Sequence, residues 1–177
     1  MTHRLAPLLF ALALAACATA PSGSDTAATF VVVRHAEKAS ETERDPDLSA
    51  AGVERARRLG ERFATADLAA IYSTDYRRTR QTVAPAAAAR GIETTLYDAK
   101  LPARELAARL RAAHGDGTVL VAGHSNTVPE IVAALCGCAV EPMPETEYDR
   151  ISTIRIAADG SARLEVARDA ATASASP

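Results

Sequence analysis

The sequence lacks several features that would point directly to a function. Basic and acidic side chains nearly balance, 20 against 22, and the formal net charge is −2. The chain as a whole therefore gives no electrostatic reason to expect nucleic acid as a partner. There is no tryptophan and no visible internal repeat, and 177 residues suffice for one domain with a core but not for two comfortable ones.

Long apolar runs are also missing. The run after Arg4 is only about a dozen residues long, too short and too abruptly ended for a membrane-spanning helix, but it has the layout of a secretory signal. The small residues before Cys17 resemble a bacterial lipobox, in which that cysteine is lipidated. We expect residues 1–16 to be a lipoprotein signal peptide and residues 17–28 a flexible tether. The protein would then be periplasmic and lipid-anchored, with the outer membrane favoured; a plain signal peptide cut near residues 18–20 is the alternative.

Cysteine is scarce. Besides Cys17 there are only Cys136 and Cys138, two positions apart. No second cysteine pair or nearby histidine completes a tetrahedral ligand set, so this pair alone does not predict a metal site. An exported compartment allows a disulfide between them, and packing as small apolar side chains is the alternative.

The pattern that is present is an alternation of strands and helices. It predicts a three-layer α/β/α sandwich with a largely parallel sheet over residues 29–168, edged by a final hairpin. Residues 169–177 are predicted to be disordered. Ser49 is the expected N-cap of the first helix, and Pro85 is expected to bend or interrupt the second. Strands are predicted at 29–33, 68–73, 92–98 and 118–122, helices at 49–64, 75–91, 102–115 and 128–137, and the hairpin at 149–168.

Polar groups follow three of these strands directly. In parallel sheets, functional side chains gather beyond the carboxyl ends of the strands, so these groups are expected to share one crevice. They make that crevice strongly cationic, and arginine donors suit phosphate oxygens. A histidine beside such cations stays neutral and can attack phosphorus. The groups are Arg34 and His35, then Arg77, Arg78 and Arg80, and finally His124.

Four stretches then resemble one family, the histidine phosphatase superfamily, which includes phosphoglycerate mutases. They are "VVVRHAEK", "DPDLSAAGVERARRLG", "YSTDYRRTRQT" and "VLVAGHSNTV", in the family's order and spacing over roughly residues 29–157. The resemblance implies a phosphoglycerate mutase-like fold. It also implies that His35 is the nucleophile that forms a phosphohistidine, with Arg34, Arg78 and His124 binding the phosphate. Ala36 stands where the family usually has glycine.

The general acid is the role that the resemblance leaves open. Asp98 lies where many members carry a glutamate, and Glu130, in the first turn of the helix after His124, is the competitor. The third possibility is that neither Asp98 nor Glu130 is the general acid.

The expected function is hydrolysis of phosphomonoesters without a metal ion or another cofactor. The chain lacks the long segments that surround the crevice in the mutases, and an open crevice favours water as the acceptor. The alternatives are a phosphohistidine or phosphoprotein phosphatase of the same fold, and a non-catalytic envelope lipoprotein that binds a phosphorylated ligand. Substrate specificity is expected to reside in the loops 38–47, 98–104 and 139–149. The sequence does not identify the substrate or the oligomeric state.

Overall fold

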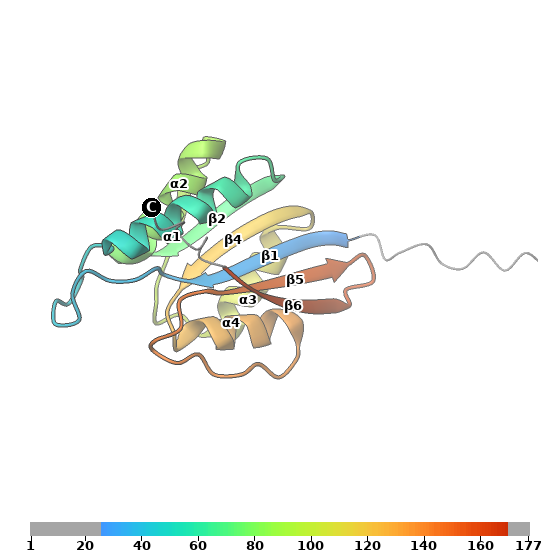
Figure 1. The fold of residues 1–177 in the computed structure, drawn as a ribbon. Helices are drawn as coiled ribbons and strands as arrows, with labels where there is room; N and C mark the ends of the chain where they lie inside the picture. Colours follow the sequence, from blue (N-terminus) through green and yellow to red (C-terminus); the bar gives the residue numbers. More distant parts are fainter. Residues whose placement is uncertain (1–25, 170–177) are drawn as a thin grey trace, which may run out of the picture.

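The computed structural model describes residues 26–169, which form one sheet with helices on both faces (Figure 1). The sheet has six strands in the order β3-β2-β4-β1-β5-β6; the first four are parallel, and β5 and β6 are antiparallel. This confirms the largely parallel sheet edged by a hairpin. The elements are β1 (Thr26–Arg34), α1 (Ala50–Phe63), β2 (Leu68–Thr74), α2 (Arg77–Arg90), β3 (Thr94–Tyr97), α3 (Ala103–Ala113), β4 (Gly117–Gly123), α4 (Thr127–Cys136), β5 (Arg150–Ala157) and β6 (Ala162–Arg168).

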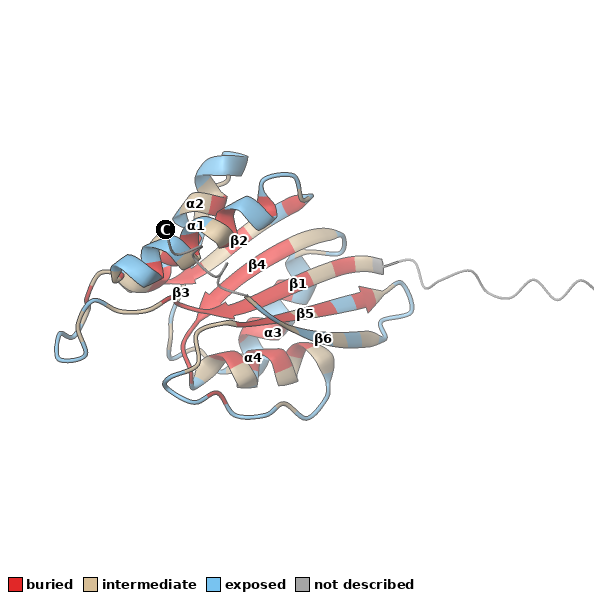
Figure 2. Cartoon of the chain, viewed as in Figure 1, coloured by how far each residue is buried: buried red, intermediate tan, exposed pale blue. Residues whose placement is uncertain are grey.

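Alternate side chains of the central strands form two separate hydrophobic cores. From β1, Phe30 and Val32 pack with α3 and α4, whereas Val31 and Val33 pack with α1 and α2. Because successive side chains of a strand point to opposite faces, an unbroken apolar strand serves both layers. Figure 2 shows the resulting band of buried residues along β4 and β1. Because these strands are buried on both faces, they fix the positions of the polar residues that follow their carboxyl ends.

Helix signals in the sequence are partly confirmed. The Ser49 side chain accepts a hydrogen bond from the Gly52 N–H at 3.1 Å, as expected of an N-cap. The expected interruption at Pro85 is wrong, because α2 continues to Arg90. Pro85 lies against Gly60 of α1, where a Cβ would come within 2.6 Å of the proline Cβ. The missing side chain at Gly60 lets α1 and α2 approach closely at Pro85.

Both predicted domain boundaries shift slightly outward. β1 begins at Thr26, inside the segment predicted as tether, because β5 is long enough to pair with it as far as Ala157. At the other end, Asp169 belongs to the folded part, since its carboxylate accepts hydrogen bonds from Arg55 and Arg58 of α1, both at 2.8 Å. The predicted signal peptide, Cys17 and the rest of the predicted tail lie outside the described residues. No helix within residues 26–169 is both long and apolar enough to cross a membrane.

The two remaining cysteines are joined. Cys136 ends α4, Gly137 follows in the left-handed conformation with a φ of 64°, and the chain turns back so that Cys138 bonds to Cys136. Of the two alternatives that the sequence left open, the structure contains the disulfide.

Candidate active site

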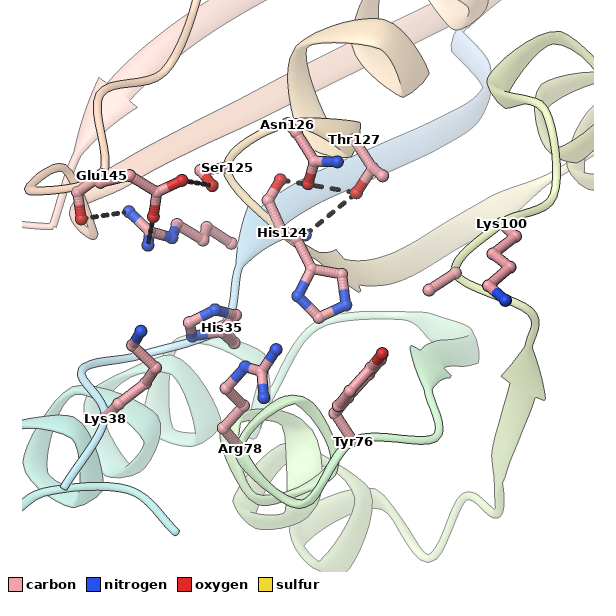
Figure 3. A pocket seen from close by; sticks show the side chains of 12 residues that line it. His35, Lys38, Tyr76, Arg78, Lys100, His124, Ser125, Asn126, Thr127 and Glu145 are labelled. Atoms are coloured by element: carbon pink, nitrogen blue, oxygen red, sulfur yellow. Dashed lines mark hydrogen bonds and ion pairs between the residues drawn. The ribbon is translucent and has the colours of Figure 1, made fainter. Parts of the chain in front are cut away.

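Three neighbouring strands, β2, β4 and β1, end beside one another and place their following residues around one cavity of about 370 Å³. The backbone N–H of His35 donates to the Gly123 carbonyl at 2.9 Å, which fixes the end of β1 to the end of β4. The adjacency follows from the sheet order, so residues far apart in the chain meet there. The lining comprises Arg34, His35, Lys38, Tyr76, Arg78, Ala99, Lys100, His124, Ser125, Asn126, Thr127 and Glu145 (Figure 3).

The structure brings only some of the predicted cationic residues to this cavity. Arg34, His35, Arg78 and His124 line it, but Arg77 and Arg80 do not. Those two arginines are exposed and pair with surface carboxylates, Arg77 with Asp47 and Arg80 with Asp75, each at 2.5 Å.

Neither predicted acid lines the cavity. Asp98 is exposed, and its carboxylate accepts the backbone N–H of Lys100 at 2.9 Å. Glu130 is also exposed and lines a neighbouring hollow of about 320 Å³. Asp98 turns back on its own loop, and Glu130 lies on the outward side of α4, so the fold brings neither carboxylate into the lining.

His35 is held in one tautomer. Its Nδ1 lies 2.8 Å from the Ala36 carbonyl oxygen, which can only accept, so Nδ1 carries the proton and Nε2 carries the lone pair. Burial lowers the pKa of His35 to about 3, and the charges of His124, Arg34 and Arg78 act in the same direction against the hydrogen bond to Ala36. At neutral pH this side chain is therefore an uncharged base with an available nitrogen, as a nucleophile must be.

His124 faces His35 across the cavity. The two ring centroids are 5.4 Å apart, and the Nε2 of His124 hydrogen-bonds the Thr74 hydroxyl at 3.0 Å. Tyr76 packs edge-on against the His124 ring with centroids 5.1 Å apart. Burial lowers the pKa of His124 to about 4, and the guanidinium groups of Arg78 and Arg34 add to the effect. Both imidazoles are thus neutral at the cavity wall.

The two arginines differ in how far their donors are used. Arg78 stacks on the Tyr76 ring at 4.4 Å, its nearest carboxylate is that of Asp45 at 3.6 Å, and its buried Nε has no hydrogen-bond partner among the described residues. Its guanidinium therefore has donors to offer to an oxyanion. Arg34 is more occupied: its Nη1 donates to backbone carbonyls of the 144–147 segment, and its Nη2 donates to Glu145 at 2.7 Å.

Each of the three loops in which specificity is expected contributes one charged side chain to the lining. Lys38, Lys100 and Glu145 belong to the loops 38–47, 98–104 and 139–149 respectively. Figure 3 shows Glu145 and Lys38 on the side of His35, with Lys100 beyond His124 on the opposite side. The sequence indicated the loops but no individual residue, since none of these segments has a periodic pattern.

The lining chemistry favours an anion. The cavity contains two arginines and two lysines against one carboxylate, that of Glu145. Within residues 26–169, no three histidine, cysteine or acidic side chains stand together in a way that could hold a metal ion. Arginines beside both histidines would repel a divalent cation, whereas a tetrahedral oxyanion would match their donors.

The neutral histidines give a direct prediction in solution. In chain labelled with ¹⁵N-histidine, we expect the rings of His35 and His124 to stay neutral, each with one protonated nitrogen, from about pH 8 to pH 5, because burial disfavours the cation. In concentrated urea they should titrate near 6.5. The unfolded chain then binds more protons below that pH, so stability is complete above about 6.5 and is lost as the pH falls toward the folded-state values. Titration of His35 near 6.5 in the folded chain would contradict this account.

The fold and the cavity together define a three-layer α/β protein with a cationic, histidine-containing pocket for an oxyanion. Residues 30–102 match the family model described as histidine phosphatase superfamily (branch 1). Over this segment, which contains Arg34, His35 and Arg78, the chain is similar to that superfamily. No curated protein sequence matches it.

Solved structures of two phosphatases and one hydrolase share the fold at low identity. The protein histidine phosphatase SixA complexed with tungstate is 17% identical with a TM-score of 0.60, covering 79% of this chain and 96% of SixA. The mycobacterial glucosyl-3-phosphoglycerate phosphatase is also 17% identical, with a TM-score of 0.64, covering 80% of this chain and 99% of that one. Mycobacterial hydrolase 1 has the same identity and a TM-score of 0.63, covering 81% and 99%.

Proposed function

We propose that this chain hydrolyses phosphomonoesters through a phosphohistidine on His35, without a metal ion. The observation that carries the proposal is the state of His35: buried, neutral, with Nδ1 held by the Ala36 carbonyl and Nε2 as the free base at the wall of a cationic cavity. Arg78 has unused donors for the phosphoryl oxygens, and Arg34 lines the same cavity.

The reaction has two displacement steps at phosphorus. In the first, the Nε2 lone pair forms a bond to phosphorus while the ester P–O bond breaks, and the leaving oxygen takes that electron pair and a proton. In the second, water attacks the phosphohistidine, the N–P bond breaks, and Nε2 recovers its lone pair as inorganic phosphate forms. The arginines stabilise charge on the equatorial oxygens in both steps. The neutral His124 ring supplies a further hydrogen-bonding group at the same oxygens.

A protein-bound phosphohistidine is the second candidate substrate. It is favoured by the fold shared with SixA, a protein histidine phosphatase, over nearly the whole length of that chain. Two of the lining side chains, those of Lys100 and Glu145, are exposed, so the cavity opens to the protein surface. A third reading, a binding protein without catalysis, predicts oxyanion binding but no turnover, so activity separates it from the other two.

The test uses the full chain with 4-nitrophenyl phosphate and a phosphohistidine-containing protein, each with and without excess EDTA. We expect phosphate release that EDTA does not reduce, together with a covalent phosphoenzyme that is stable to alkali and labile to acid, as a phosphoramidate is. Loss of activity in EDTA would contradict the metal-free mechanism. Binding of tungstate without turnover of either substrate would favour the non-catalytic reading.

Export and anchoring through Cys17 remain part of the proposal. The segment that carries them lies outside the described residues. Mass spectrometry of protein extracted from membranes would detect a lipid on Cys17, and an unmodified, unprocessed N-terminus would count against it.

A further inference from the structure

Glu145 is the one carboxylate among the residues that line the cavity. Its side chain is 77% exposed, so it stands at the mouth rather than at the floor. It belongs to the irregular segment between α4 and β5, which neither the sequence pattern nor the family resemblance connects with catalysis. The proposed hydrolysis, however, needs a proton donor at the leaving oxygen, and neither Asp98 nor Glu130 reaches the cavity.

Two side chains of the site hold the Glu145 carboxylate in place. Its Oε2 accepts from Arg34 Nη2 at 2.7 Å, and its Oε1 accepts from the Ser125 hydroxyl at 2.5 Å. The backbone is fixed as well, because Arg34 Nη1 donates to the carbonyls of Pro144, Glu145 and Glu147 at 3.2, 2.8 and 3.0 Å. The exposed carboxylate is therefore anchored to a buried arginine that immediately precedes the nucleophile.

The position of Arg34 sets how far Glu145 stands from a bound phosphoryl group. Glu145 is the only acceptor that Nη2 has among residues 26–169, so the second N–H of that nitrogen remains for an oxyanion. Two acceptors on one guanidinium nitrogen lie roughly 5 Å apart, given N···O distances of about 2.8 Å. An oxyanion held by Arg34 thus places its substituents within reach of the Glu145 carboxyl group, on the solvent side of His35.

We propose that Glu145 donates the proton to the leaving oxygen of the substrate; the inference rests on the hydrolysis proposed above. As the bond from His35 Nε2 to phosphorus forms and the ester P–O bond breaks, the leaving oxygen takes the bonding electron pair and the Glu145 proton. In the second step the carboxylate accepts a proton from the attacking water, and the site returns to its starting state.

Substrate binding supplies the proton that this step uses. In the free chain the hydrogen bond from Ser125 and the charge of Arg34 lower the pKa of Glu145, so the carboxyl group is ionised. A bound phosphoryl dianion shares Arg34 Nη2 and repels the carboxylate, which raises its pKa. The complex therefore takes up a proton from solvent, and Glu145 becomes an acid only when there is a leaving group to protonate.

The test is a leaving-group series with three matched carboxyl-to-amide variants. Glu145→Gln, Asp98→Asn and Glu130→Gln are compared with the wild type on phenyl, 4-nitrophenyl and 2,4-dinitrophenyl phosphate, whose leaving groups need progressively less protonation. For Glu145→Gln we expect kcat/KM to fall by about 10²-fold on phenyl phosphate and by less than about threefold on the dinitrophenyl ester. The other two variants should show no dependence on the leaving group.

A second readout does not depend on turnover. Calorimetry of tungstate binding in buffers of different ionisation enthalpy should show uptake of about one proton by the wild type and almost none by Glu145→Gln. An equal loss on all three esters, unchanged activity of Glu145→Gln, or a leaving-group-dependent loss in Asp98→Asn would overturn the assignment of Glu145 while leaving the hydrolase intact. Failure of the wild type on every ester would overturn the proposed function itself, and this inference with it.

Discussion

Replacing His35 with alanine is expected to reduce kcat for 4-nitrophenyl phosphate by at least about 10⁴-fold, to the background of the assay. The covalent intermediate cannot form without Nε2 of His35, and the other neutral imidazole at the cavity, that of His124, has its Nε2 engaged by the Thr74 hydroxyl. The His35→Ala chain should still bind tungstate, because Arg34, Arg78 and His124 remain. Steady-state rates, and the absence of acid-labile phosphoenzyme after a rapid quench, check the prediction.

His114→Ala is the matched control for this substitution. Like His35, His114 directly follows a secondary-structure element, in this case helix α3. Its Nε2 hydrogen-bonds the Tyr72 hydroxyl at 2.9 Å, and it does not line the cavity. Its removal should leave kcat within about threefold of the wild type. Substantial phosphatase activity in a folded His35→Ala chain would refute the phosphohistidine mechanism, whereas equal losses in both variants would indicate a general effect on stability.

The central fold follows from the sequence because its signals are local. An apolar run from Thr29 to Val33 can bury both faces only in the middle of a covered parallel sheet, and the Asp159-Gly160 pair indicates the hairpin turn. Once the strands are placed, the meeting of His35 and His124 follows from the adjacency of β1 and β4. Arg77 and Arg78 both lie in the first turn of α2, so in the sequence only the family pattern distinguishes Arg78 from its neighbour.

The acid could not be found in the same way. The segment between α4 and β5 contains Glu141, Glu145 and Glu147, and no periodicity distinguishes them. What selects Glu145 is a contact across 111 positions in the chain, made by a buried guanidinium. The family resemblance pointed to Asp98, and its place in the first helical turn after His124 made Glu130 the competitor, but neither residue lines the cavity. Loop residues of this kind are specified by tertiary contacts alone.

Charge pairing explains why the folded part extends to Asp169. A polar tail without apolar residues gives no local signal for order, so disorder was the reasonable expectation. Arg55 and Arg58 nevertheless bind the Asp169 carboxylate, and Arg55 also pairs with Glu37 at 2.6 Å. Because Glu37 follows His35 by two residues, this cluster joins the end of β6 to the loop after His35, a connection visible only in three dimensions.

Arg78→Gln is expected to lower kcat/KM for aryl phosphates by about 10²- to 10³-fold, the usual cost of removing one charged donor from a phosphoryl-transfer site. The guanidinium has a buried Nε without a partner among the described residues, and its nearest carboxylate, that of Asp45, lies 3.6 Å away, so its donors are available to the transferred group. The inhibition constant of tungstate should rise in parallel, since the same donors bind the ground-state oxyanion.

The neighbouring residue provides a control that differs by one position in the chain. Arg77→Gln removes an exposed guanidinium that pairs with Asp47 on the surface, a contact worth at most about 1 kcal/mol. Activity and tungstate inhibition should stay within about threefold of the wild type, because this charge is screened by solvent and lies outside the cavity. If the two variants lost activity equally, the pocket would be acting through its general positive potential. A loss confined to Arg78→Gln would show instead that directed hydrogen bonds from one arginine hold the phosphoryl group in line with His35.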